Sequence, residues 1–96
     1  MKMSMKLRDD VLSLMEEYIR QEGGKGNSLS ETRVSREATG YGDFVGTLRK
    51  WDGGKPGPSM VTVAKFEAYL AEQVGPDFYK SFMERRAAMV AADGGF

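Results

Sequence analysis

The chain has 96 residues, of which 41% are hydrophobic and 29% charged, and its 14 basic side chains balance its 14 acidic ones. This length suits one small domain with a single core. Cysteine and histidine are both absent, which excludes disulfides and thiolate chemistry and removes the usual zinc ligand and the usual general base. No apolar run approaches the ~18 residues of a membrane span, and the first ten residues lack the apolar centre of a signal peptide, so we expect a cytoplasmic protein.

The spacing of apolar residues and the placement of turn residues predict an all-α chain. In order, five helices are expected at about Lys6–Gln21, Leu29–Ala38, Gly42–Trp51, Met60–Gln73 and Asp77–Ala92. Ser28 with Glu31 three residues later fits a capping box for the second helix, and Ser59 can cap the fourth. We expect a single helical domain over residues 1–96, with a core unit at 6–73 and a C-terminal helix at 77–92.

Four apolar residues in the middle of the chain have a more specific spacing. Val34, Ala38, Val45 and Leu48 lie at offsets of zero, four, eleven and fourteen residues, with a break at residues 39–41, TGY. A step of four and a step of three each fit about one helical turn. The pattern predicts two short helices that cross at a Gly-containing turn, which is a helix-turn-helix unit.

This part of the chain resembles the phage-repressor and Cro-like (XRE-type) helix-turn-helix family. The likeness lies in the stretch ATGYGDFVGTLRK, the loop with Pro58-Ser59 and the helix VTVAKFEAYL, and it covers about 70% of the chain. The family usually has Ala where this chain has Ser35, and its turn glycine one residue earlier than Gly40. The resemblance implies a five-helix lambda-repressor-like fold and sequence-specific binding to double-stranded DNA, with the third helix in the major groove.

Matching the family's mode of binding to this chain gives eleven candidate DNA contacts: Ser28, Ser30, Arg33, Arg36, Tyr41, Gly42, Asp43, Thr47, Arg49, Lys50 and Lys55. Lys50 suits a guanine edge or a phosphate, and Thr47 suits a thymine methyl or a phosphate. The two serines and the free amides at the start of the second helix are positioned to hold a phosphate. The arginines and Lys55 are candidate backbone clamps. Residues 25–65 carry seven basic and four acidic side chains, which favours this assignment.

Several of these residues also have an ordinary structural explanation. Asp43 suits the positive end of a helix dipole as well as the amino group of a cytosine. Arg33 and Arg36 bracket Glu37 and can form a solvated face. Trp51 is expected in the core, although a lone tryptophan can also stack on a base or a partner.

The fifth helix adds apolar surface to a core that is already complete with four helices. Its residues Phe78, Tyr79, Phe82 and Met83 either pack against a second copy, giving a homodimer that reads two half-sites, or close the core of one chain. The sequence leaves both possibilities open.

Two functions therefore follow from the sequence. The first is a repressor-like transcriptional regulator of phage or mobile-element type that occupies an operator. The alternative is a protein-binding helical adaptor or inhibitor on a helix-turn-helix frame without DNA reading, which the neutral net charge and Asp43 favour. We expect no catalytic residue, metal, cofactor or membrane partner, because the adjacent acidic pairs diverge on a helix and GGKPG lacks P-loop spacing.

Overall fold

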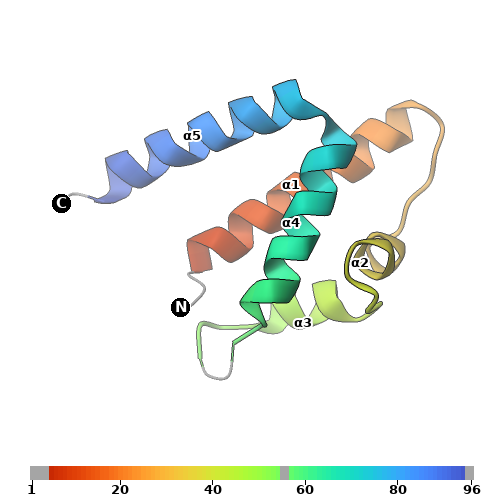
Figure 1. Cartoon of the computed structure of the whole chain (residues 1–96), viewed down its shortest axis with the longest axis horizontal. Helices are drawn as coiled ribbons and strands as arrows, with labels where there is room; N and C mark the ends of the chain where they lie inside the picture. Colours follow the sequence, from red (N-terminus) through yellow and green to blue (C-terminus); the bar gives the residue numbers. More distant parts are fainter. Residues whose placement is uncertain (1–4, 55–56, 95–96) are drawn as a thin grey trace.

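Five helices make up the computed structural model of the chain, which describes residues 5–54 and 57–94, and no strand occurs in these ranges (Figure 1). The helices are α1 (Met5–Gly24), α2 (Glu31–Thr39), α3 (Phe44–Lys50), α4 (Met60–Val74) and α5 (Pro76–Gly94). The prediction of an all-α chain with five helices is confirmed. None of the described helices combines the length and the apolar character needed to cross a membrane.

The predicted start of the second helix is wrong by two residues. Ser30, not Ser28, caps α2, because its Oγ accepts a hydrogen bond from the backbone N–H of Arg33 at 3.1 Å. The capping box predicted for Ser28 and Glu31 therefore does not form. Leu29 lies just before the cap and packs against the core that contains Val34, which is the spacing of a hydrophobic staple.

The third helix is also shorter than predicted. It begins at Phe44, with Asp43 at the N-cap position, and ends at Lys50. Gly42 belongs to the turn before the helix, and Trp51 is half-buried just after it. The predicted start of the fourth helix is confirmed, since the Ser59 side chain accepts from the backbone N–H of Thr62.

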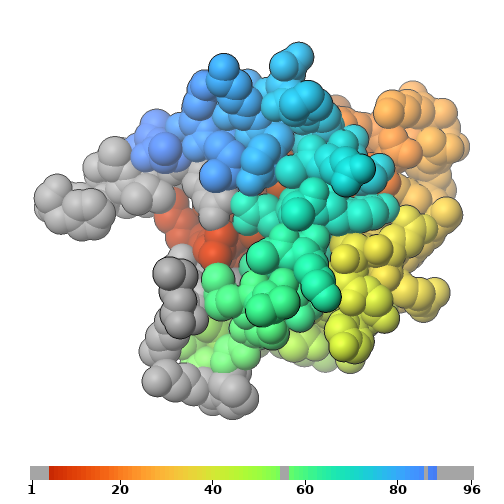
Figure 2. All heavy atoms as spheres, in the orientation of Figure 1, coloured from red at the N-terminus to blue at the C-terminus, as the bar shows by residue number. Residues whose placement is uncertain are grey.

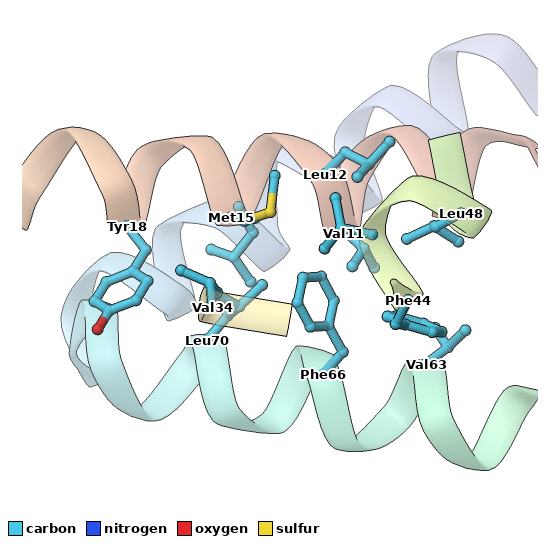
Figure 3. Packing of buried hydrophobic residues seen from close by; sticks show 12 residues of the cluster. Val11, Leu12, Met15, Tyr18, Val34, Phe44, Leu48, Val63, Phe66 and Leu70 are labelled. Carbon is cyan, nitrogen blue, oxygen red and sulfur yellow. The ribbon is translucent and has the colours of Figure 1, made fainter. Parts of the chain in front are cut away.

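The core lies between α1 and α4 and is closed on one side by α2 and α3 (Figure 3). Among the side chains that the structure describes, twelve buried apolar ones form this core: Val11, Leu12, Leu14, Met15, Tyr18, Val34, Phe44, Val45, Leu48, Val63, Phe66 and Leu70. Phe66 is fully buried and meets Phe44 edge-to-face, with 5.4 Å between ring centroids. Three of the four apolar positions that predicted the two-helix unit are thus buried, and Ala38 is half-buried beside them. Burial of this kind is the main source of fold stability.

Helix α5 runs along the opposite side of the molecule from α3 (Figure 1). Its residues Phe78, Tyr79 and Phe82 are half-buried and pack against the chain's own core. The hydroxyl of Tyr79 donates to Oε1 of Glu67 on α4 at 3.0 Å. These aromatic residues therefore close the core of a single chain, whatever further contacts α5 makes.

Candidate nucleic-acid interface

The turn between α2 and α3 is held by hydroxyl groups as well as by a glycine. Gly40 has φ +86° and donates its backbone N–H to the carbonyl of Arg36 at 2.8 Å, which ends α2 in the left-handed conformation that glycine favours. Thr39 is still helical, and its Oγ1 donates to the carbonyl of Ser35 at 2.8 Å and accepts from the N–H of Tyr41 at 3.1 Å. Helix α2 therefore ends at Thr39, one residue later than predicted, and Gly40 takes the left-handed position directly after it.

Ser35 connects the two helices directly. Its side chain is fully buried, and its Oγ donates to the carbonyl of Tyr41 at 2.6 Å and accepts from the N–H of Val45 at 3.3 Å. The hydroxyl thus satisfies one group in the turn and one of the free amides in the first turn of α3. These two hydrogen bonds therefore connect α2 to the turn and to the start of α3.

One face of α3 is open to solvent, as predicted. Val45 and Leu48 point into the core, whereas the exposed positions follow at helical spacing on the other side: Asp43, Gly46, Thr47 and Lys50. We call these four residues the α3 stripe. Tyr41 lies just before the helix and is 62% exposed.

Arg36 lies across the turn beside the start of α3. A Cβ placed on Gly42 would lie 3.4 Å from Nη2 of Arg36 and 3.4 Å from Cγ2 of Thr32, so the absence of a side chain at Gly42 leaves room for both. Neither Arg36 nor Lys50 forms an ion pair with any residue that the structure describes. Thr32 was not among the candidate contacts predicted from the sequence, although its position four residues before Arg36 puts it on the same face of α2.

Two of the predicted backbone clamps are held by carboxylates of the same chain. Arg33 pairs with Glu37 on the next turn of α2 at 2.9 Å, and this hydrogen bond raises the pKa of Arg33. Arg49 pairs with Glu31 at 2.5 Å and with Glu16 at 3.4 Å, and the hydrogen bond that it donates to Glu31 raises the pKa of Arg49 as well. Arg49 thereby connects α3 to the first turn of α2 and to α1.

The carboxylate of Glu37 also joins α2 to α4. The hydroxyl of Tyr69 donates to its Oε2 at 2.8 Å. The hydrogen bonds from Arg33 and Tyr69 lower the pKa of Glu37. Burial, followed by the hydrogen bond to Glu37, raises the pKa of Tyr69 above its ordinary value. The Glu37 carboxylate therefore serves mainly to connect α2 to α4.

The predicted phosphate site at the start of α2 is not assembled as expected. Ser28 is exposed in the segment before the helix, two residues before the cap. Ser30 already accepts the amide of Arg33, and Glu31 brings a carboxylate into the first turn, where it opposes an anion. Lys55 lies outside the described residues.

A hollow of about 210 Å³ adjoins the α3 stripe. Its walls come from two parts of the chain: Tyr41, Asp43, Phe44 and Thr47 on one side, and Pro58, Ser59 and Thr62 at the start of α4 on the other. Figure 2 shows α4 between α5 and the surface formed by α2 and α3. From the sequence, Ser59 was predicted only as a helix cap. Its place in this hollow could not be predicted, because no local sequence pattern indicates that α4 begins beside α3.

The structure thus brings Arg36, Tyr41, Asp43, Thr47 and Lys50 to one surface, beside the turn at Gly42. Among the described side chains, no three carboxylates gather closely enough to hold a metal ion. No protein-family model, no curated protein and no solved structure matches the chain.

Proposed function

We propose that the chain is a sequence-specific DNA-binding regulator that acts by occupying an operator, with α2 and α3 as a helix-turn-helix unit. The observation that carries the proposal is the solvent-open α3 stripe on a helix whose other side is anchored in the core. An α-helix fits the major groove of B-DNA, which is about 12 Å wide. Gly46 in the middle of the stripe allows the helix backbone to approach the bases closely.

The charges around α3 support the same function. Arg36 and Lys50 are exposed cations without an ion pair to a described residue; Lys50 belongs to the α3 stripe, and Arg36 lies beside the turn that precedes it. We assign phosphate contacts to Arg36 and a guanine edge or a phosphate to Lys50. Arg33 and Arg49 are already neutralised by carboxylates, so they contribute less to attraction of the DNA backbone. With a net charge of zero, binding is expected to depend on these few cations.

The proposal includes a homodimer formed through α5. This helix lies on the opposite side of the molecule from α3 (Figure 1), so a partner on α5 leaves the α3 stripe free. Two-fold pairing would give a dimer with two copies of α3, which read two half-sites of one operator where the two-fold axis turns both helices toward the same side of the duplex.

The proposal is tested by fluorescence anisotropy on duplex DNA from the promoter of the protein's own gene, over 50 to 200 mM salt. We expect binding that weakens as the salt concentration rises. The protein's basic side chains release condensed counterions from the phosphates, and this release is less favourable at higher salt. Arg36→Ala and Lys50→Ala should each weaken binding and reduce the slope of log K against log salt by about one. Arg20→Ala is the matched control, since Arg20 is an exposed cation on α1, outside the α3 stripe and outside helix α5.

The alternative function predicts a different result. A protein-binding adaptor is favoured by the hollow beside α3, whose lining includes Phe44, Pro58 and the exposed Tyr41. Absent or salt-insensitive DNA binding that neither Arg36→Ala nor Lys50→Ala changes would overturn the DNA-binding proposal and favour this alternative.

A further inference from the structure

Asp43 carries a carboxylate that makes neither a capping hydrogen bond nor an ion pair with a described residue. It occupies the N-cap position of α3, but its side chain makes no capping hydrogen bond. Its backbone angles, φ −94° and ψ 1°, differ from the extended conformation of Ser30 and Ser59, whose side chains do cap their helices. Nor does Asp43 form an ion pair with a described residue. The carboxylate is exposed at the edge of the hollow beside α3.

An unpaired carboxylate at this position is a disadvantage for general DNA binding. Asp43 lies on the α3 stripe four residues before Thr47 and seven before Lys50, so it faces the same way as both. If α3 enters a groove, phosphates repel this charge, and the cost is offset only where a base donates a hydrogen bond to it. Seven residues of helix span about 10 Å, or about three base-pair steps of 3.4 Å. The α3 stripe therefore presents a hydrogen-bond acceptor, Asp43, at one end and a hydrogen-bond donor, Lys50, at the other, and the two would meet different base pairs.

Only one base is well matched to this acceptor in the major groove. An ionised carboxylate accepts hydrogen bonds and cannot donate them. Guanine presents O6 and N7 and thymine presents O4, all of them acceptors, whereas adenine presents an amino group next to the acceptor N7. Cytosine presents its N4 amino group alone. We propose that Asp43 is a specificity-determining residue that accepts a hydrogen bond from the exocyclic amino group of a cytosine. This inference rests on the proposed DNA-binding function.

The proposal is tested by selecting duplexes from a randomised pool with the full chain and three variants: Asp43→Asn, Asp43→Ala and Glu72→Gln. The unaltered chain should require cytosine at one position, and another base there should weaken binding about fivefold or more. Asp43→Asn should move the preference at that position to adenine, because an amide can donate to N7 and accept from the N6 amino group. Asp43→Ala should lose the preference and bind the other duplexes more tightly.

Glu72→Gln is the matched control, because it removes the same charge from an exposed site near the far end of α4. It should leave base preference unchanged. If both Asp43 variants tighten binding to every duplex equally, Asp43 acts only through its charge, and the inference is overturned while the proposed function stands. If the unaltered chain shows no salt-dependent binding to duplex DNA, the proposed function itself fails, and the inference fails with it. Circular dichroism should show all four proteins folded, with at most a small loss of melting temperature in the two Asp43 variants, because the carboxylate lies at the positive end of the α3 dipole.

Discussion

Ser35 is a polar residue that is fully buried beside the apolar core. Its hydroxyl is fully buried and joins the carbonyl of Tyr41 to the N–H of Val45. Buried polar groups must be hydrogen-bonded, and a group that loses its partner costs about 1–3 kcal/mol. Ser35→Ala should therefore lower the free energy of unfolding by about 1–3 kcal/mol in urea denaturation, because the N–H of Val45 loses its partner in a buried site.

The control for this prediction is the same substitution at an exposed position. Ser13 lies on the solvent side of α1, and alanine has the higher helix propensity there. Ser13→Ala should leave the free energy of unfolding unchanged or raise it slightly. Equal effects at the two serines would mean that the Ser35 hydroxyl contributes nothing to the junction between α2 and α3.

The basic residues illustrate what the sequence can and cannot predict at this scale. The pairing of Arg33 with Glu37 follows from a spacing of four residues on one helix and is readable from the sequence. The pairing of Arg49 with Glu31 joins residues 18 positions apart. It depends on how α2 and α3 cross, which no local pattern gives. For this reason Arg36 and Lys50 could not be singled out beforehand from the other candidate cations.

At the scale of the helical element, two glycines of the α2–α3 unit have opposite roles. Gly40 adopts φ +86° at the end of α2, a conformation that costs other residues about 1–2 kcal/mol. Gly46 lies inside α3, and a methyl group added there meets nothing within 4 Å. Gly40→Ala should destabilise the chain by about 1–2 kcal/mol, whereas Gly46→Ala should stabilise it by up to about 1 kcal/mol, because alanine is the better helix former.

The two glycine variants control for each other, since the chemical change is the same. Urea denaturation of both proteins measures the two effects on one scale. A loss of stability in Gly46→Ala would contradict a regular helix through residue 46. An unchanged stability in Gly40→Ala would contradict the left-handed end of α2.

The start of a helix was predicted correctly where the sequence offers one capping residue, and incorrectly where it offers two. Ser59 is the single capping residue before α4, and the predicted start of that helix is confirmed. The segment SLSE offers two serines two residues apart, and the sequence pattern favoured Ser28 because Glu31 completes a capping box. Starting at Ser30 instead puts Leu29 and Val34 in the positions of a hydrophobic staple against the core. Burial of these apolar side chains is worth more than one reciprocal hydrogen bond at the surface.

At the scale of the whole molecule, the proposed homodimer depends on helix α5. Phe78, Tyr79 and Phe82 already cover the core of one chain, so the proposed dimer would use the part of α5 that they leave available. Two weak half-site contacts that are linked in one dimer bind far more tightly than either does alone, because the second contact becomes intramolecular. The proposed recognition helix α3, with Lys50 on it and Arg36 beside it, would gain from such linkage.

The homodimer is tested by sedimentation equilibrium over a dilution series. The unaltered chain should give twice the mass of one 10.6 kDa chain, with dissociation on dilution. Met83→Glu should shift the equilibrium to the monomer, because half-buried Met83 would become a carboxylate that loses water without gaining a partner at the interface. Ser81→Glu adds the same charge at an exposed position about 200° around α5 and should remain dimeric, and circular dichroism should show both variants folded. A monomer at every concentration of the unaltered chain would contradict the dimer and would require a single copy of α3 to supply all of the sequence reading.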